Sequence, residues 1–328
     1  MKKHFVAGFS FLTLVVAIGM NGCSSSTSNN SPFSTPTWTT GNFGSTATIL
    51  GICFPTSSIA YACGFNGTIL KSTDGGTTWT AQNSNTKENL YRISFKDALN
   101  GFVGGNNGAI LGTSDGGTTW TSFSFGLFGS VNIRDVLYDA SGHVLVAGGD
   151  QGVGTTFISS KDGTGIWNTV GGSSSFYSIA SMHDPANNAY AVVGSGGLSL
   201  TTSDLGKTWN FSPVITADFL GVDFIDSKNG FGVTEEGKFT KSTDGGTTWN
   251  LGSNSVISGS LRTVKMLSTS EVWAAGANGN LAHTTNGGSS WAVSIQGGFT
   301  GSWNQIVQKD AHTWAFVGDN GTLFWLSE

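Results

Sequence analysis

The sequence is poor in charge, proline, cysteine and helical periodicity. Charged residues make up 11% of the 328 residues, and there are only 5 prolines and 3 cysteines. Glycines, in contrast, number 49, and aromatic residues make up 12%. This composition excludes an intrinsically disordered chain, which would be rich in charge and poor in aromatic residues. Beyond the N-terminus no segment has a helical period. Abundant glycine with β-branched and aromatic residues predicts short strands joined by tight turns, an all-β fold.

The N-terminus has the features of an export signal. Lys2 and Lys3 precede an apolar run over residues 5–20, which ends at Gly22 and Cys23. The run is short for a membrane span, so we predict a signal peptide over residues 1–22. The Gly22–Cys23 junction resembles a bacterial lipoprotein box, which implies that Cys23 carries the lipid. The alternative is an ordinary cleaved signal that leaves Cys23 as a thiol.

Residues 23–36 are a Ser/Thr/Asn-rich stretch with little apolar area to bury, which predicts a flexible tether. We expect an exported protein, periplasmic or at the cell surface, and anchored as a lipoprotein in the outer membrane. Residues 1–22 hold two of the 15 basic residues and none of the 20 acidic ones, so the remaining chain has a net charge of 13 − 20 = −7. This acidity argues against nucleic acid as a partner and against membrane contact other than through the anchor. We expect a monomer.

One eight-residue turn is repeated along the chain. Ser72–Trp79 reads Ser-Thr-Asp-Gly-Gly-Thr-Thr-Trp and recurs unchanged at residues 242–249. Altered copies lie at residues 113–120, 160–167, 202–209 and 284–291, and the closing tryptophans are 40 to 47 residues apart. A period of this length is typical of a β-propeller or a solenoid.

The second repeat unit predicts four strands. Residues 91–95 and 101–104 read as two strands, and Asn106–Gly108 is a hairpin signal before a third strand at 109–113. A fourth strand opens at 120–123 after the repeated turn. Four antiparallel strands in about 42 residues make a propeller blade rather than a helical repeat.

The two ends of the chain complete each other. The last unit, residues 318–328, stops where the repeated turn should begin, so it lacks a fourth strand. Trp38 lies in a Thr-Trp-Thr context like that of Trp79 but has no strands before it. We therefore predict a seven-bladed β-propeller over residues 37–328, whose last blade is closed by the N-terminal strand. Closure removes open sheet edges.

The repeated turn, an Asp box, is predicted to be structural. The Asp side chain can accept backbone hydrogen bonds within its own turn, the glycines permit the turn, and the Trp buries a large surface. The alternative is a catalytic or calcium-binding role, but each box offers one carboxylate and the boxes are about 40 residues apart, which does not suit calcium. We predict no metal site. The structural residues are Asp74, Trp79, Asp115, Trp120, Asp162, Trp167, Asp204, Trp209, Asp244, Trp249, Asn286 and Trp291.

These boxes resemble the BNR repeats of sialidases, sortilin-type receptors and photosystem II assembly factors. The blade text at residues 101–120 is most similar to the photosystem II assembly and stability factor family. The resemblance covers residues 37–328. It implies a seven-bladed, exported or lumenal propeller that is not an enzyme and binds a protein or peptide partner. We expect no cofactor.

The chain has only three arginines, Arg92, Arg134 and Arg262, and all lie near the start of the first strand of a blade. First strands line the channel of a propeller, so we predict that these residues surround its mouth. The predicted ring consists of Gly51, Arg92, Arg134, Ser178, Gly221, Arg262 and Asn304. Guanidinium groups suit carboxylates, so Arg92, Arg134, Arg262 and Asn304 are candidate binding residues for a protein or extended peptide. The alternative is that each arginine pairs with a local acid such as Asp135 or Asp223.

A sialidase-like glycoside hydrolase or a glycan-binding protein is the alternative function. Sialidases use three arginines, but the arginine-bearing signature near their N-terminus and their Tyr–Glu pair are absent here. We predict no catalytic residue. The acids to test are Glu235, Glu236, Asp150 and Asp319.

Cys53 and Cys63 flank a turn between two expected strands. Two alternatives remain for this pair: a cross-strand disulfide, or two buried free thiols.

Overall fold

In the computed structural model, every described strand lies within Thr35–Glu328. The described residues are 36–123, 131–150, 153–161, 168–172, 174–184, 186, 188–213, 217–252 and 257–328. The predicted signal peptide and Cys23 lie outside these residues, as does all of the predicted tether except residue 36.

The described strands form seven four-stranded antiparallel sheets, which we call blades. Blade 1 contains β2 (Ile49–Cys53), β3 (Ala60–Gly64), β4 (Ile69–Ser72) and β5 (Thr80–Gln82). Blade 2 contains β6 (Leu90–Phe95), β7 (Gly101–Gly105), β8 (Ile110–Thr113) and β9 (Thr121–Ser122). Blade 3 contains β10 (Ile133–Tyr138), β11 (His143–Asp150), β12 (Val153–Lys161) and β13 (Asn168–Gly172). Blade 4 contains β14 (Phe176–Ser181), β15 (Tyr190–Gly194), β16 (Leu198–Thr202) and β17 (Asn210–Pro213).

Blades 5 to 7 complete the set. Blade 5 contains β18 (Phe219–Phe224), β19 (Gly230–Thr234), β20 (Phe239–Ser242) and β21 (Asn250–Leu251). Blade 6 contains β22 (Leu261–Met266), β23 (Val272–Gly276), β24 (Asn280–Thr284) and β25 (Ala292–Ile295). Blade 7 contains β26 (Trp303–Asp310), β27 (Thr313–Gly318), β28 (Thr322–Ser327) and β1 (Thr37–Thr40). Short 3-10 helices join the second and third strands of five blades: η1 (Phe65–Gly67), η2 (Asn106–Gly108), η3 (Ser195–Gly197), η4 (Ala277–Gly279) and η5 (Asp319–Gly321).

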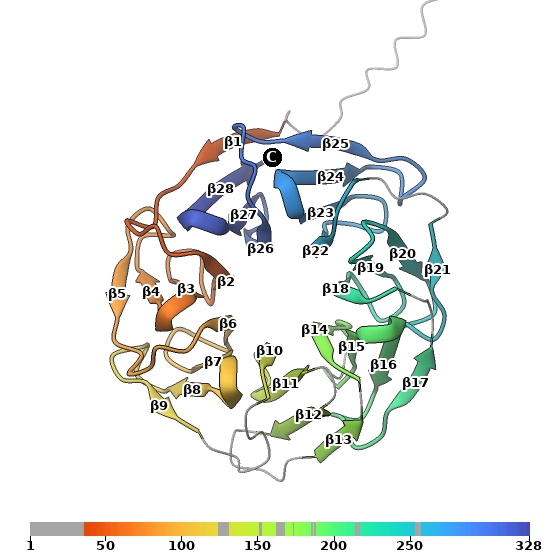
Figure 1. The fold of residues 1–328 in the computed structure, drawn as a ribbon, viewed down its shortest axis with the longest axis horizontal. Helices are drawn as coiled ribbons and strands as arrows, with labels where there is room; N and C mark the ends of the chain where they lie inside the picture. The colour runs from red at the N-terminus through yellow and green to blue at the C-terminus, as the bar shows by residue number, and fades with distance from the viewer. Residues whose placement is uncertain are drawn as a thin grey trace, which may run out of the picture. The chain divides into compact units, whose positions relative to one another are not determined.

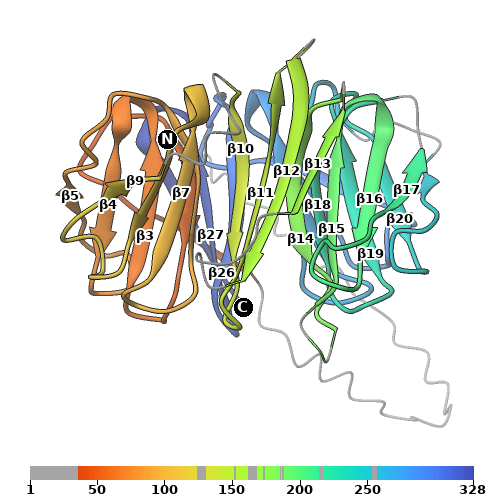
Figure 2. The same ribbon diagram turned by 90° about the horizontal axis from the view of Figure 1, so that it is seen from below.

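The blades surround a central opening, with the first strand of each blade innermost (Figure 1). Each innermost strand contacts the innermost strands of both neighbouring blades, including β26 with β2. In side view the strands run between two faces of the ring (Figure 2). The all-β propeller with four-stranded antiparallel blades is therefore confirmed.

The N-terminal strand closes blade 7, as the sequence predicts. β1 pairs antiparallel with β28, from Thr37 opposite Ser327 to Thr40 opposite Phe324. The Trp38 ring lies 4.9 Å from the Phe316 ring and meets Trp273 edge to face at 5.6 Å. Trp273 belongs to blade 6, so the closing strand also packs the junction between blades 6 and 7.

The core lies between neighbouring blades. One buried cluster joins Tyr61 of blade 1 to Leu90 and Trp120 of blade 2, and another joins Phe231 of blade 5 to Leu261 of blade 6. Trp120 is only 4% exposed. The apolar side chains of one blade thus require the next blade, and no blade buries its core alone.

Backbone hydrogen bonds assign the connections to two faces. The box glycine Gly75 donates its N–H to Ser58 at 2.7 Å, in the turn between the first two strands of the same blade. On the opposite face, Gly67 of η1 donates to Glu88 at 2.8 Å, in the loop that leads to blade 2. We call the first the box face. The second, where the innermost strands begin, is the mouth face.

Candidate functional site at the mouth of the central cavity

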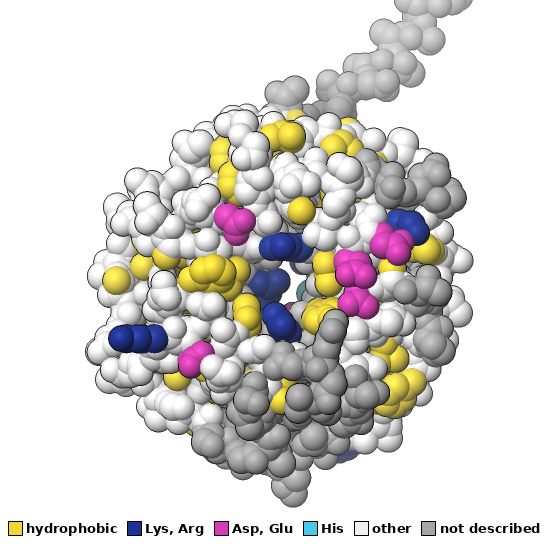
Figure 3. Space-filling model, in the orientation of Figure 1, with side chains coloured by type: hydrophobic (Ala, Val, Ile, Leu, Met, Phe, Trp, Pro, Cys, Tyr) yellow, Lys and Arg dark blue, Asp and Glu magenta, His cyan; other side chains and the backbone are white. Residues whose placement is uncertain are grey.

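A cavity of about 340 Å³ lies among the innermost strands. Its polar lining includes Arg92, Asp135, Asp223, Arg262, Lys265 and Gln305. Lys and Arg side chains gather around the central opening in the space-filling view (Figure 3). The cavity is therefore a polar site with charges of both signs.

A β-bulge opens every innermost strand. In blade 2, Leu90 pairs with Gly105 and Arg92 with the adjacent Gly104, so Tyr91 has no partner of its own. The same shift occurs at the start of the other six innermost strands. The extra residues are Leu50, Tyr91, Arg134, Tyr177, Leu220, Arg262 and Asn304. A bulge bends the strand and redirects the extra side chain.

The bulges correct the predicted ring of seven equivalent positions. Arg134, Arg262 and Asn304 occupy bulge positions, but Arg92 is the first paired residue after its bulge. The residues equivalent to Arg92 are Gly51, Asp135, Ser178, Gly221, Thr263 and Gln305. The prediction mixed two positions because alignment to the box Trp does not reveal which residue is unpaired. The spacing held a signal: Arg92 precedes its Trp by 28 residues and Arg262 by 29.

Arg92 is largely bound by its own chain. Its Nη1 donates to the carbonyl of Leu50 at 2.5 Å and of Tyr91 at 3.1 Å, and its Nη2 donates to the carbonyl of Asn304 at 3.3 Å. These carbonyls belong to blades 1, 2 and 7. Arg92 Nε lies 3.9 Å from Asp135 Oδ1. Arg92 therefore holds neighbouring blades together and lies near a local acid, as the alternative in the sequence analysis expects. Few of its N–H donors remain for a ligand.

Asp135 is a buried acid at the edge of the cavity. Its Oδ1 accepts the N–H of Val136 at 2.9 Å, and its Oδ2 accepts the N–H of Ile179 at 2.8 Å. Burial raises the pKa of Asp135 to about 6, although Arg92 and these N–H groups lower it. Both protonation states are therefore accessible near neutral pH.

Arg134 packs against the Tyr91 ring at the mouth. Its guanidinium carbon lies 5.0 Å from the centre of the Tyr91 ring, a cation–π arrangement. Burial raises the pKa of Tyr177, and the charge of Arg134 opposes this shift. Tyr91, Arg134 and Tyr177 hold the bulge positions of three successive blades, so they form one side of the mouth.

Arg262 is the exposed arginine of the site. Its Nη1 donates to Asn304 Oδ1 at 3.3 Å. Asn304 is 5% exposed and is held by Nδ2 bonds to the carbonyl of Ile49 at 2.9 Å and to Asp319 Oδ1 at 3.3 Å. Among the described residues, no carboxylate lies within ion-pair distance of Arg262. A fixed amide thus orients an exposed guanidinium.

Polar side chains also link the innermost strands to one another. Asp223 pairs with Lys265 at 3.0 Å rather than with an arginine, and its Oδ2 accepts the N–H of Met266 at 2.8 Å. Gln305 Oε1 accepts the N–H of Ile52 at 2.7 Å across the closure from blade 7 to blade 1. These bonds hold the cavity wall in place.

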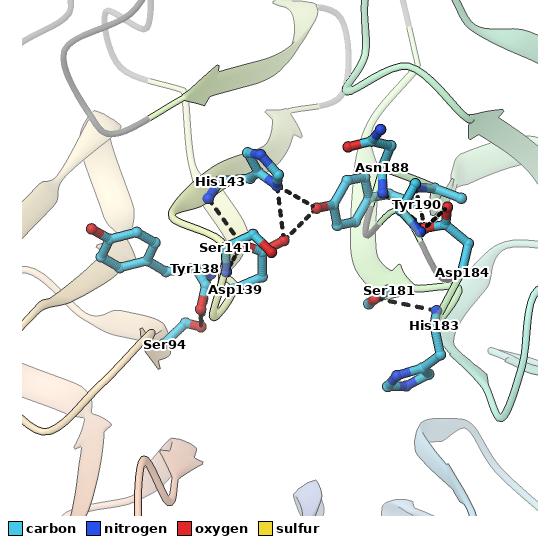
Figure 4. A network of polar contacts seen from close by, with 12 residues as sticks. Ser94, Tyr138, Asp139, Ser141, His143, Ser181, His183, Asp184, Asn188 and Tyr190 are labelled. Atoms are coloured by element: carbon cyan, nitrogen blue, oxygen red, sulfur yellow. Dashed lines mark hydrogen bonds and ion pairs between the residues drawn. The ribbon is translucent and has the colours of Figure 1, made fainter.

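A second polar network lies near the box face, between blades 3 and 4 (Figure 4). His143 Nδ1 lies 3.1 Å from both Asp139 Oδ2 and the Tyr190 hydroxyl, and that hydroxyl also donates to Asp139. Tyr190 is fully buried. Three side chains that satisfy one another fasten two blades together. This network was not predicted, because Tyr190 lies 47 and 51 residues from His143 and Asp139 and the three residues match no motif.

The described Asp boxes share one set of contacts. In the first box, Asp74 accepts the N–H of Thr78 at 2.8 Å and the hydroxyl of Ser72 at 2.8 Å. The Thr78 hydroxyl is the largest cause that lowers the pKa of Asp74 to about 2. Asn286 makes the same two contacts, with Ser290 N–H and the Thr284 hydroxyl. An uncharged amide therefore suffices for the turn. Asp162 and Trp167 lie outside the described residues.

The cysteines are free, so the disulfide alternative is not realised. Cys53 lies opposite Tyr61, and Cys63 lies opposite Gly51. The cysteines are thus diagonal across the strand pair, where residues are about 7–8 Å apart, beyond the usual span of a disulfide. Burial raises the pKa of Cys53 to about 12 and also raises the pKa of Cys63.

Two of the four acids considered for hydrolysis, Glu236 and Asp319, have local partners. Glu236 pairs with Lys238 at 2.6 Å, and Asp319 Oδ2 accepts the N–H of Ser302 at 2.9 Å. The side chain of Asp150 is not among those described. Within the described part of the chain, no cluster of three or more His, Cys, Asp or Glu residues could hold a metal ion. No helix there is long and apolar enough to cross a membrane.

Comparison with known protein families gives one match to a family model. The family model for photosynthesis system II assembly factor YCF48 matches residues 28–126 and 213–328. The chain belongs to this family. No sequence among the curated proteins matches it.

Solved structures of this family share the fold. A structure described as YCF48 bound to D1 peptide has 20% identity and a TM-score of 0.70, and the match covers 89% of this chain and 95% of that one. YCF48 from Cyanidioschyzon merolae has 17% identity and a TM-score of 0.69, covering 88% and 98%. An inactive virginiamycin B lyase from Staphylococcus aureus, solved with quinupristin, has 10% identity and a TM-score of 0.75, covering 90% and 100%. At these identities the likeness concerns the fold.

Proposed function

We propose that this chain is a seven-bladed propeller that binds a carboxylate of a protein or extended peptide at the mouth of its central cavity, without enzymatic activity. Arg262 carries the proposal. It is exposed, oriented by Asn304, and has no acidic partner among the described residues. A guanidinium in this state can donate two parallel hydrogen bonds to a carboxylate.

The family adds support for the class of ligand. A solved YCF48 structure is described as bound to a D1 peptide, and a peptide is the ligand that we propose here. Of the four residues in the sequence hypothesis, Arg262 and Asn304 form the proposed anchor, whereas Arg134 lies three blades away, in blade 3. Arg92 supports the wall rather than the ligand.

We test this function with purified exported protein and two sets of short peptides, with a free C-terminal carboxylate or a C-terminal amide. Only the free carboxylates should bind. Arg262→Ala should weaken binding about 10- to 100-fold, as expected for a lost charged hydrogen bond. Arg262→Lys should recover part of the loss, because an ammonium keeps the charge but not the planar fork.

Asp115→Asn is the matched control, because it alters a box on the opposite face and should leave the affinity unchanged. Equal binding of amidated and free peptides would contradict the proposal. Turnover of sialosides that disappears in Arg262→Ala would instead support the glycoside hydrolase.

We also propose that the protein is exported and held at the outer membrane through lipid on Cys23. In bacterial cells, Cys23→Ala should move the protein from the membrane fraction to the soluble exported fraction. Retention in the membrane fraction would contradict the anchor and leave the binding function untouched.

A further inference from the structure

Arg92 and Asp135 are neighbours because of the bulge register. Each is the first paired residue after its bulge, on adjacent innermost strands, and both side chains line the cavity. Arg92 Nε lies 3.9 Å from Asp135 Oδ1. The wall of the proposed site therefore contains an internal carboxylate beside a guanidinium.

Backbone hydrogen bonds hold the carboxylate of Asp135 in this position. The N–H groups of Val136 and Ile179 each hold one of its oxygens, and the residue is 8% exposed. Its negative charge therefore stays at the mouth whenever Asp135 is ionised. Burial brings the pKa of Asp135 to about 6, so the charge changes between pH 5 and pH 7.5.

The effect of protonating Asp135 on the net charge of the cavity depends on the other charged side chains that line it. The cavity is lined by Arg92 from β6, Asp223 from β18, and Arg262 and Lys265 from β22, while β14 contributes the neutral Ser178. On β11, the neutral Ala147 lies opposite Asp135. Lys265 is paired with Asp223, and Arg92 lies beside Asp135. The five charged side chains sum to one positive charge, and protonation of Asp135 doubles it.

We propose that Asp135 is a specificity-determining residue of the mouth. Its ionised carboxylate repels anionic ligands and lowers their affinity, and its protonation removes this repulsion. The identity of the ligand as a peptide carboxylate rests on the proposed function. The effect of Asp135 applies to any small anion at the mouth. Binding is then weak at neutral pH and strong in acidic surroundings.

The test measures affinity at pH 5.0 and pH 7.5 for two probes, a free-carboxylate peptide and inorganic sulfate. The peptide has an acetylated N-terminus and no ionisable side chain, so both probes keep a constant charge at the two pH values and only the protein titrates. For the wild-type chain we expect about tenfold tighter binding at pH 5.0, the size expected for one unit charge roughly 10 Å away at an effective dielectric constant of about 20. Asp135→Asn should bind at pH 7.5 as tightly as wild type does at pH 5.0, and its affinity should not change with pH.

Asp223→Asn is the matched control, since it removes a second cavity carboxylate. It should tighten binding at both pH values alike and keep the tenfold ratio. If Asp135→Asn does not fold, ¹³C-carboxyl NMR of wild type replaces it: added anion should raise the pKa of Asp135, because binding and protonation favour each other.

The outcomes separate the two proposals. An equal pH ratio in wild type and Asp135→Asn overturns the role of Asp135, even where the peptide binds. A pH ratio for sulfate that depends on Asp135, with no peptide binding, supports the role and overturns the peptide function. Binding of neither probe overturns both.

Discussion

The box face and the mouth face of this propeller are built from the same repeat but differ in how far it varies. In each of the five described boxes an Asp or Asn oxygen accepts the N–H of the residue four positions later, at 2.8–3.0 Å. At the mouth, the seven bulge positions hold Leu, Tyr, Arg, Tyr, Leu, Arg and Asn. A turn that only has to join two strands can be copied, whereas seven strands that converge on one cavity can each supply a different side chain.

The largest effect should come from the box face, where the repeat supports the core. Trp120→Ala removes a buried indole between blades 1 and 2, and we expect it to lower the free energy of unfolding by about 3–5 kcal/mol. Chemical denaturation measures this value. A loss below about 1 kcal/mol would mean that the box Trp is not a core residue.

Arg92→Ala tests whether the mouth also has a structural member. It leaves three backbone carbonyls of blades 1, 2 and 7 without a guanidinium, and we expect a loss of about 2–3 kcal/mol. Arg262→Ala provides the contrast, because its side chain is exposed and should cost less than about 0.5 kcal/mol. Equal losses of unfolding free energy in the two variants would mean that Arg92 and Arg262 do not differ in structural role.

A smaller effect concerns pH and Asp135. Its folded pKa of about 6 is above that of an unfolded aspartate, so it stabilises the fold below about pH 4 and this contribution is lost as pH rises to 6. The stability of Asp135→Asn relative to wild type should therefore increase by about 2 kcal/mol between pH 4 and pH 7. Urea unfolding at both pH values measures the difference. A constant difference would mean that Asp135 does not titrate in this range.

The smallest effect should follow Asp115→Asn. Asn286 occupies the same place in its box, so the amide should preserve the turn and only slightly lower the melting temperature at neutral pH. The Thr119 hydroxyl is the largest cause that lowers the pKa of Asp115 to about 2. Its stabilising charge is therefore complete above about pH 4 and lost as pH falls towards 2. The melting temperatures of variant and wild type should converge at pH 2, and divergence there would contradict this account.

The sequence predicts the parts of this fold that depend on local pattern. The strands of blade 2 lie within two residues of their expected bounds, and Trp38 revealed the closing strand because it matched Trp79 in context. The bulges were not predictable in the same way. Alternation continues across a bulge, and only the pairing of Leu90 and Arg92 with adjacent residues of β7 shows that Tyr91 is extra.

The candidate site was predicted in part for a related reason. All three arginines are at the mouth, but their roles depend on contacts between distant blades. Arg92 donates to a carbonyl 212 residues away in sequence, and Asn304 orients Arg262 from the neighbouring blade. Such contacts exist only after the ring has closed, so no local pattern encodes them.

The pairing of β1 with β28 makes blade 7 the last blade that can be completed during folding. In sequence, blades 1 to 6 lie between β1 and β28, so blade 7 can be completed only after those six blades have been synthesised. Contacts between such distant segments form slowly, because a long loop must close first. Until then both strands have unpaired edges that another copy of the chain can pair with. The ring therefore passes through an open state in which an exchange of β1 between two chains is the expected error.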